Sequence, residues 1–112
     1  MAPLLEGLKR EELWVVLVNQ ACRVIKRVRV SVGGLTETSA DIRLIMKEAI
    51  SCCAVAMCVL HNHPSGQVRP SREDDQLTER VKQAAKLMDI RMMDHIIIGS
   101  GAYYSYSDEG RM

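Results

Sequence analysis

Two segments near the start of the chain carry the hydrophobic patterns of paired β-strands. Residues 12–18 are almost wholly apolar and rich in β-branched side chains, which predicts a buried strand. After a polar turn at 19–22, residues 23–32 largely alternate between valine and mostly basic side chains, so we expect a half-exposed strand antiparallel to the first. Gly33-Gly34 would end this strand. The valines that would share its inner face are Val24, Val28, Val30 and Val32.

Two helices are predicted in the rest of the chain. Thr38 or Ser39 can cap a helix over about 40–52, where apolar side chains recur at helical spacing. A second helix starts at Ser71. Its apolar stripe would be formed by Leu77, Val81, Ala84, Ala85 and Met88.

Apolar runs predict three more strands. A buried strand over 54–60 precedes a loop over 61–70, a further strand covers about 91–98, and a last short strand covers 103–105. The resulting order is β-β-α-β-α-β-β. Two main helices packed on one mixed β-sheet is the simplest arrangement for this order, so we predict a single α/β sandwich domain over residues 1–112.

Composition and charge narrow the class of protein. The chain has 112 residues, enough for one hydrophobic core, and 15 Lys and Arg against 14 Asp and Glu give a net charge of +1. A protein whose main work is to coat nucleic acid would be more basic. No apolar run is long enough to cross a bilayer, and the first residues lack the pattern of a signal peptide, so we expect no membrane association.

The cysteines indicate a reducing compartment. None of the four forms a C-x-x-C pair, and three lie in apolar stretches, which predicts buried, reduced thiols and a cytoplasmic protein. The four residues are Cys22, Cys52, Cys53 and Cys58.

The residues with the clearest chemistry follow the third predicted strand. His61 and His63 are two positions apart, so on extended backbone both imidazoles point to the same side. Asp74 lies in the first turn of the next helix, where the loop brings the chain back. Two imidazoles and one carboxylate leave a fourth position open, as in a catalytic zinc site, where a bound water has its pKa lowered towards ~7. Iron or manganese would also fit this donor set.

These residues also have a purely structural interpretation. Ser71 and Asp74 have the spacing of a capping box, in which the serine and the acid satisfy helix amides without a metal. Pro64 and Pro70 are typical turn residues. From the residues alone, the metal site and the capped helix are supported about equally.

The same segment resembles a known family. His61-x-His63-Pro64 followed by Ser71-x-x-Asp74 is similar to the JAMM (MPN+) metalloprotease motif. The fuller run His-Asn-His-Pro-Ser-Gly, followed by Pro-Ser-Arg-Glu-Asp, resembles the RadC family, long labelled DNA repair proteins. The resemblance covers about residues 9–108. Its further matches are the segment 94–99 (Asp-His-Ile-Ile-Ile-Gly), Thr78, Arg43 and Lys47-Glu48-Ala49.

The resemblance implies a JAMM/MPN, cytidine-deaminase-like fold and a zinc-dependent hydrolase that cleaves a peptide or isopeptide bond in an unidentified peptide or protein substrate. His61, His63 and Asp74 would bind Zn²⁺, with water as the fourth ligand. Ser71 would donate a hydrogen bond to the oxyanion of the tetrahedral intermediate.

A glutamate near the start of the chain completes the implied site. In the family it precedes the first strand and acts as general base, and Glu11 fits that pattern. Glu12 is the alternative, and the sequence does not decide which of the two points inward. Fuller members of the family also carry an N-terminal helix-hairpin-helix region that is missing here, so we expect an excised domain or a short relative.

Two other functions remain open at this point. The domain could be a DNA repair or recombination-associated binding module without hydrolysis, although its near-neutral charge argues against strong DNA binding by this domain alone. A catalytically inactive scaffold ranks last, because the sequence keeps every metal ligand. We expect a solvated face for the basic stretch, which comprises Arg23, Lys26, Arg27 and Arg29.

His95 and the tyrosines have the weakest signals. His95 could orient a metal ligand, but we favour a satisfied structural histidine. We expect Tyr103, Tyr104 and Tyr106 to be edge-strand and surface residues.

Overall fold

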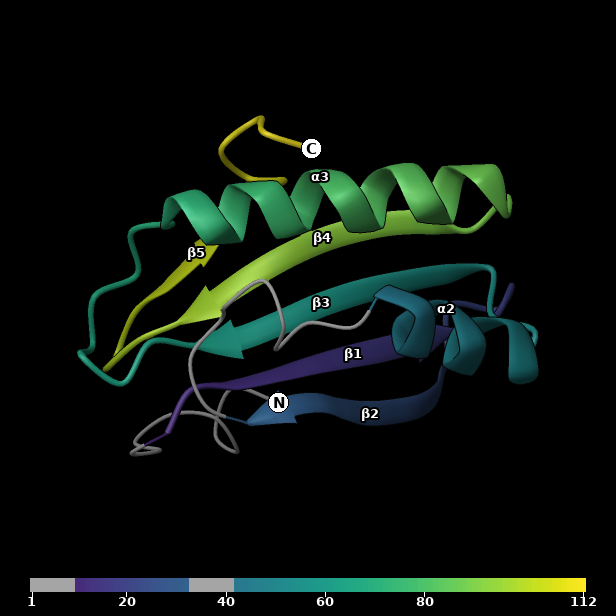
Figure 1. Cartoon of the computed structure of the whole chain (residues 1–112), viewed down its shortest axis with the longest axis horizontal. Coiled ribbons are helices and arrows are strands. Elements are labelled where there is room, and N and C mark those ends of the chain that lie inside the picture. The colour runs from purple at the N-terminus through teal and green to yellow at the C-terminus, as the bar shows by residue number, and fades with distance from the viewer. Residues whose placement is uncertain (1–9, 33–41) are drawn as a thin grey trace.

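One mixed sheet forms the centre of the fold (Figure 1). The structure, a computed structural model, describes residues 10–32 and 42–112, and its five strands are ordered β2-β1-β3-β4-β5. The fold class is confirmed, and the predicted order of elements is confirmed over these described residues. The strands are β1 (Glu12–Val18), β2 (Val24–Val32), β3 (Ala56–Asn62), β4 (Arg91–Ile98) and β5 (Tyr103–Ser105), and the helices are α2 (Ile42–Ser51) and α3 (Arg72–Leu87).

The connection between β3 and β4 determines where a site can form. These two strands are parallel, whereas the other neighbours in the sheet are antiparallel. Helix α3 joins them, so it begins at the edge of the sheet where both strands end (Figure 1). In α/β folds the carboxyl ends of parallel strands are the usual place for a ligand.

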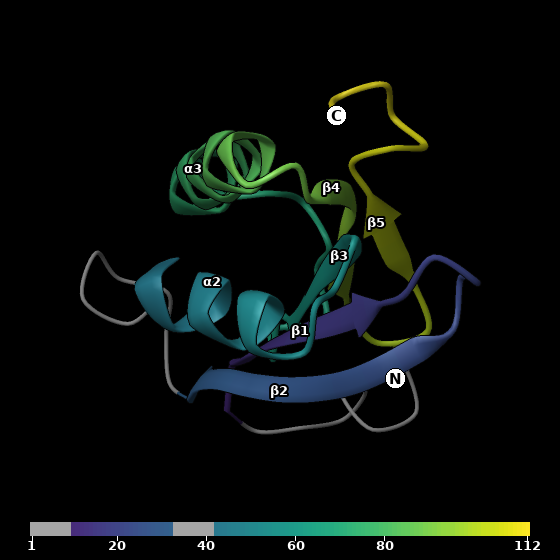
Figure 2. The same cartoon turned by 90° about the vertical axis from the view of Figure 1, so that its right-hand side faces the viewer.

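The two described helices, α2 and α3, pack on one face of the sheet (Figure 2). Alternate residues of β1 and β3 point into this layer, which explains a core of branched aliphatic side chains. The opposite face also carries buried apolar residues, including Val16, Val18 and Leu60. Burial on both faces explains why residues 13–18 are apolar throughout instead of alternating. The helix-side core includes Leu13, Val15, Leu17, Met57, Val59, Ile45, Ala49, Leu77, Val81 and Ala85.

β3 lies two residues further along the chain than the hydrophobic run predicts. The strand continues through His61 and Asn62, which we expected in a loop. The reason is tertiary: His61 pairs with Leu13 of β1, and Asn62 pairs with Ile98 of β4, so both neighbouring ladders extend past the apolar segment. His61 is therefore held on a strand in the interior of the sheet.

The inner face of β2 is also partly different from the prediction. Val28 and Val30 pack against the core, but Val24 is 57% exposed. An irregularity in the β1–β2 register between Leu17 and Val18 pairs Val24 with Val18, whose side chain lies on the opposite face of the sheet. Gly33-Gly34 and the predicted helix caps Thr38 and Ser39 lie outside the described residues.

Two further expectations need correction. Met88 is 54% exposed because α3 ends at Leu87 and Met88 is its C-cap. All four cysteines are free thiols, but Cys22 and Cys53 are exposed, on turns with positive φ, and Cys52 and Cys58 are only partly buried. Among the described residues, no helix has the length and apolar character needed to span a membrane.

Candidate metal centre

Three separate segments meet at the end of β3. His61 is in the strand, His63 follows it, Asp74 is in the first turn of α3, and Glu11 directly precedes β1. One potential ligand atom from each of the four lies within 4.8 Å of all the others. The structure therefore brings together the three predicted metal ligands and the predicted general base.

The distances between ligand atoms show that His61, His63 and Asp74 lie closer to one another than Glu11 lies to either histidine. The Nε2 atoms of His61 and His63 are 3.0 Å apart. Asp74 Oδ1 lies 2.9 Å from His61 Nε2, and Asp74 Oδ2 lies 3.1 Å from His63 Nε2. Glu11 Oε1 is farther away, at 3.9 and 3.7 Å from the two Nε2 atoms. Two imidazoles and one carboxylate thus converge on a point beside which Glu11 stands.

The loop after β3 fixes the ring of His63. Its Nδ1–H donates to the carbonyl oxygen of Gln67 at 3.0 Å, and its backbone N–H donates to Ile98 at 3.0 Å. Gly66, at φ +85°, turns the loop onto the end of β4, where a Cβ on Gly99 would overlap the Gly66 carbonyl oxygen. Because the loop is pinned at both points, the Nε2 atom of His63 faces His61.

The capping box and the metal site are compatible rather than alternative. Asp74 Oδ2 accepts the backbone N–H of Ser71 at 2.7 Å, and Ser71 Oγ accepts the backbone N–H of Asp74 at 3.1 Å. The other carboxylate oxygen, Asp74 Oδ1, is buried and has no hydrogen-bond partner among the described residues, although it lies beside His61 Nε2. One oxygen caps α3 while the second is left facing the histidines.

The chemistry of this donor set fits a cation. His63 Nδ1 carries a proton because it donates to a carbonyl oxygen, so Nε2 of the neutral ring is a lone-pair acceptor. That acceptor faces another ring nitrogen and a carboxylate oxygen at about 3 Å, an arrangement that costs free energy unless a proton or metal lies between them. The unpartnered Asp74 Oδ1 has the same requirement. Nitrogen and carboxylate donors of this kind are typical zinc ligands.

The charges of the cluster also favour a cation. Burial opposes ionisation of Asp74, but the adjacent His61 and His63 outweigh it, and the pKa of this carboxyl lies well below its ordinary value. The hydrogen bond to Asp74 raises the pKa of His63, against the opposing effect of burial. Asp74 is therefore a carboxylate at neutral pH, and a metal would compete with a proton for His63.

The side chains of Glu11 and Glu12 point to opposite faces of the sheet, and only Glu11 lies near the candidate metal ligands. The carboxylate of Glu11 lies beside the two histidines. The carboxylate of Glu12 instead accepts the indole N–H of Trp14 at 2.9 Å and lies 3.9 Å from Arg29. The two acids point to opposite faces because side chains alternate along extended backbone.

Asn62 lies within the motif that resembles the family, but the sequence assigned it no role. Its side-chain oxygen accepts the backbone N–H of Glu12 at 2.7 Å, and its amide group donates to the carbonyl oxygen of Arg10 at 2.9 Å. Asn62 therefore holds the backbone on both sides of Glu11. In the sequence, an asparagine at a strand end is typical of a turn. Its partner Arg10 is 52 residues away along the chain, so only the folded structure reveals this contact.

His95 lies directly behind His61. It is fully buried on β4, and its Nε2 atom is 2.7 Å from His61 Nδ1. Its other ring nitrogen contacts the hydroxyl of Thr78. Burial lowers the pKa of His95 to about 3, and the neighbouring His61 adds to the effect. His95 is therefore buried with both ring nitrogens in contact, as expected of a satisfied structural histidine, and one of these contacts is to a candidate metal ligand.

The expectation for the tyrosines was wrong for Tyr106. Tyr103 is 65% exposed as predicted, but Tyr106 is 1% exposed and stacks on the His95 ring, with centroids 4.9 Å apart and planes 5° apart. Its hydroxyl donates to Asp75 on α3 at 2.6 Å. The segment after β5 folds back onto α3. The residues around Tyr106 are mostly polar, so the sequence predicted a surface position instead of this packing.

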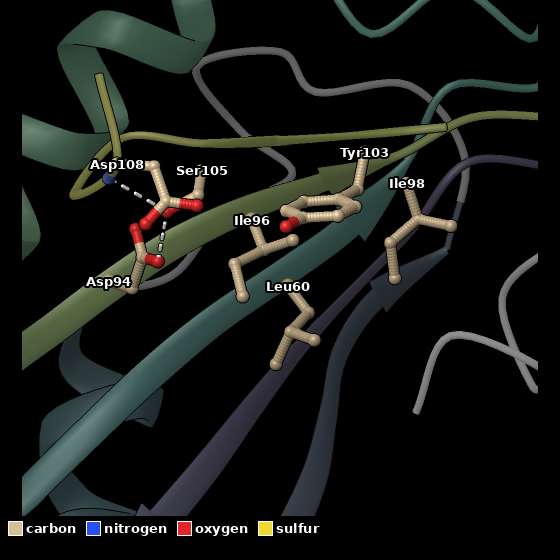
Figure 3. A pocket seen from close by; sticks show the side chains of 7 residues that line it. All are labelled: Leu60, Asp94, Ile96, Ile98, Tyr103, Ser105 and Asp108. Atoms are coloured by element: carbon tan, nitrogen blue, oxygen red, sulfur yellow. Dashed lines mark hydrogen bonds between the residues drawn. The ribbon is translucent and has the colours of Figure 1, made fainter. Parts of the chain in front are cut away.

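A hollow of about 400 Å³ lies on the sheet face away from the helices (Figure 3). Leu60, Ile96 and Ile98 form its apolar floor, and Asp94 lies at its polar end. Asp94 accepts hydrogen bonds from the Ser105 hydroxyl and from the backbone N–H groups of His95 and Ser107. The Asp94 carboxylate therefore stabilises the turn after β5.

The fold and the site together define a mixed α/β domain with a candidate metal centre of two histidines and one aspartate. The chain belongs to the RadC-like JAB domain family, whose model matches residues 1–111. A UPF0758 protein of Porphyromonas gingivalis is 53% identical over 111 residues, which are 98% of this chain and 49% of the relative. UPF0758 proteins of Flavobacterium johnsoniae and Streptococcus gordonii are 39% and 41% identical, over 98% and 90% of this chain and 48% and 45% of their own lengths. The chain thus spans about half the length of these relatives.

Proposed function

We propose that this domain is a zinc-dependent hydrolase of the JAMM type that cleaves a peptide or isopeptide bond. One observation carries the proposal: the ligand atoms of Glu11, His61, His63 and Asp74 lie within 4.8 Å of one another, and Asp74 keeps a buried oxygen without a hydrogen-bond partner among the described residues. An ordinary capped helix needs neither the two inward histidines nor the free carboxylate oxygen.

Three side chains would hold the zinc. His61 and His63 would bind through Nε2, since hydrogen bonds occupy their Nδ1 atoms, and Asp74 would bind through Oδ1, since Oδ2 caps α3. Three protein ligands would leave a position open for water, and zinc would act as a Lewis acid that lowers the pKa of that water to about 7.

Glu11 would move the proton of that water. Its Oε1 atom stands beside the two Nε2 atoms, at 3.9 and 3.7 Å, without belonging to the inner donor set. A carboxylate in this position can accept the proton during attack on the amide carbonyl and return it to the leaving amine nitrogen. Asn62 holds the backbone on either side, which limits the range of positions open to Glu11.

Ser71 would stabilise the oxyanion. Its Oγ accepts the backbone N–H of Asp74, so the hydroxyl keeps its own proton to donate. A donor aimed at the developing negative charge accelerates acyl transfer by about 10²–10³-fold in enzymes where one has been removed. Ser71 would thus cap the helix through its lone pair and serve catalysis through its proton.

The test is zinc-dependent cleavage of a proteome-derived peptide library, followed by mass spectrometry of new amino termini. We expect zinc-loaded protein to create new termini, and Glu11→Gln to reduce the rate by about 10²–10⁴-fold, the usual contribution of general base catalysis. Glu12→Gln is the matched control, because Glu12 faces the opposite side of the sheet, and it should keep the wild-type rate. A zinc-loaded wild-type protein no more active than Glu11→Gln would contradict the proposal.

DNA binding is the weaker function for this domain. The basic side chains of β2 are exposed, as expected, but Lys26 pairs with Glu48 at 2.6 Å and Arg29 lies 3.9 Å from Glu12. These acids offset part of the charge that would attract phosphate.

The four free thiols support a reducing, cytoplasmic location for the hydrolase.

A further inference from the structure

A line of buried polar groups runs from His61 back into α3. His61 Nδ1 meets His95 Nε2 at 2.7 Å, and His95 Nδ1 meets the Thr78 hydroxyl. Thr78 Oγ1 donates to the backbone carbonyl oxygen of Asp74 at 2.8 Å. The line therefore starts at one candidate metal ligand and ends on the backbone of another.

The carbonyl oxygen at the end of this line sets the order of donors and acceptors along it when His95 is neutral. A carbonyl oxygen only accepts, so the proton of Thr78 points to Asp74, and Thr78 Oγ1 is left to accept from His95 Nδ1. A neutral His95 that carries its proton on Nδ1 presents a lone pair at Nε2. His61 Nδ1 is then the donor in the last contact, and the lone pair of a neutral His61 lies on Nε2, 2.9 Å from Asp74 Oδ1, where a cation is needed between the two atoms.

We propose that His95 and Thr78 are positioning residues that hold His61 in the Nδ1–H tautomer, with its Nε2 lone pair directed at the metal. The inference deepens the proposed function and rests on it for the identity of the metal ligands. Metal-bound histidines commonly donate their other N–H to a carboxylate or a carbonyl, which fixes the tautomer and the ring orientation. Here the acceptor is the imidazole of His95 instead of a carboxylate or carbonyl. Thr78 is needed in turn to hold His95 in its own tautomer.

The surroundings of His95 prevent the line from rearranging. Its ring is fully buried and lies flat against Tyr106, whose hydroxyl is held by Asp75 of α3. The guanidinium group of Arg111 lies over the Tyr106 ring, 4.9 Å from its centroid, and forms a 2.7 Å ion pair with Asp75. A ring flip of His95 would break the contacts to both His61 and Thr78.

Paired substitutions of Thr78 give the sharpest test. Thr78→Val keeps the shape of the side chain but removes the acceptor for His95 Nδ1, whereas Thr78→Ser keeps the hydroxyl. Competition with a chromophoric chelator would measure the dissociation constant for zinc. We expect Thr78→Val to weaken zinc binding by about tenfold or more, within the range found for such outer groups, and Thr78→Ser to stay within about twofold of wild type.

Substitutions of His95 test the next contact. His95→Phe keeps a ring against Tyr106 but cannot accept from His61, so zinc binding should weaken by about 10–100-fold. His95→Gln retains a side-chain oxygen that can accept from His61 Nδ1 and an amide group that can donate to Thr78, and it should recover part of the loss. Thermal unfolding of the metal-free variants shows whether each remains folded.

The tautomer itself can be observed without zinc. Long-range ¹H–¹⁵N correlation spectra of metal-free protein at pH 8.5 should show the His61 proton on Nδ1 in wild type and Thr78→Ser, and shared between both nitrogens in Thr78→Val. A wild-type His61 protonated only on Nε2 would overturn the inference, as would wild-type zinc affinity in both Thr78→Val and His95→Phe. Failure of wild-type protein to bind zinc would instead contradict the proposed function, and the spectra of metal-free protein would still decide the tautomer.

Discussion

The side chain of Asn62 accepts the backbone N–H of Glu12 at 2.7 Å, and this contact ties the start of β1 to the end of β3. Its second hydrogen bond, to Arg10, closes the clamp around Glu11. The clamp connects the strand that carries His61 with the segment that carries the proposed general base. The position of Glu11 relative to the metal ligands therefore depends on a residue that does no chemistry of its own.

We predict that Asn62→Ala lowers the hydrolysis rate more than it lowers zinc affinity. The substitution removes two hydrogen bonds, to the N–H of Glu12 and the carbonyl oxygen of Arg10, at a combined cost of about 1–3 kcal/mol in the free energy of unfolding. A displacement of Glu11 by about 1 Å can reduce the rate by about 10²-fold. Urea denaturation, zinc titration and rates on a cleaved peptide measure the three effects separately. Equal losses of rate and zinc affinity would contradict a role confined to Glu11.

We also predict that Gly99→Ala disturbs the site from a distance. A Cβ at this position would overlap the carbonyl oxygen of Gly66, so the loop that carries His63 must move. Overpacking of this kind costs about 1–3 kcal/mol, and zinc affinity should fall with it. Gly101→Ala is the control, because its φ of +69° strains an alanine but nothing lies within 4 Å of the added atom. Unchanged zinc affinity in Gly99→Ala would show that the loop does not position His63.

The burial of His95 predicts how stability depends on pH. The pKa of His95 is about 3 in the folded protein and near 6.5 in the unfolded chain, so below pH 6.5 only the unfolded chain takes up this proton. The free energy of unfolding should therefore fall by about 2 kcal/mol from pH 7 to pH 5 on account of His95. Urea denaturation of metal-free protein at pH 7, 6 and 5 would measure it.

His95→Gln supplies the control for that pH series. The raised pKa of His63 has the opposite sign, since it stabilises the folded protein as pH falls through that pKa, but both proteins share it. The lowered pKa of Asp74 affects stability only at more acidic pH, where the unfolded carboxyl becomes protonated. The variant should therefore lose less stability than wild type between pH 7 and pH 5. Parallel pH curves for the two proteins would rule out a neutral, buried His95 as the cause.

The order of elements could be predicted because it depends on local patterns. The apolar run of 12–18, the Ser71 cap and the short run before His61 each describe their own segment. The spacing of His61 and His63 likewise predicts that their side chains lie on one side, since residues two positions apart on a strand share a face. These features required no knowledge of distant residues.

The parts that could not be predicted depend on pairs far apart in the chain. Asn62 reaches Arg10 across 52 positions, and His95 reaches His61 across 34. Val24 turned outward because of an irregularity in the β1–β2 register, and Tyr106 was buried by the return of the chain to α3. No local periodicity encodes such contacts. The choice between Glu11 and Glu12 also required the exact start of β1, and element boundaries are the least predictable feature of a sequence.

The central claim is that His61, His63 and Asp74 hold one metal ion, and metal content tests it most directly. Protein purified without chelator or a nickel column would be measured by inductively coupled plasma mass spectrometry, beside Asp74→Ala, His61→Ala/His63→Ala and the control Glu73→Ala, which changes an exposed acid of the same helical turn. We predict close to one zinc per chain in wild type and Glu73→Ala and almost none in the other two. Absence of metal from wild type after incubation with zinc, or retention of zinc by Asp74→Ala, would contradict the account.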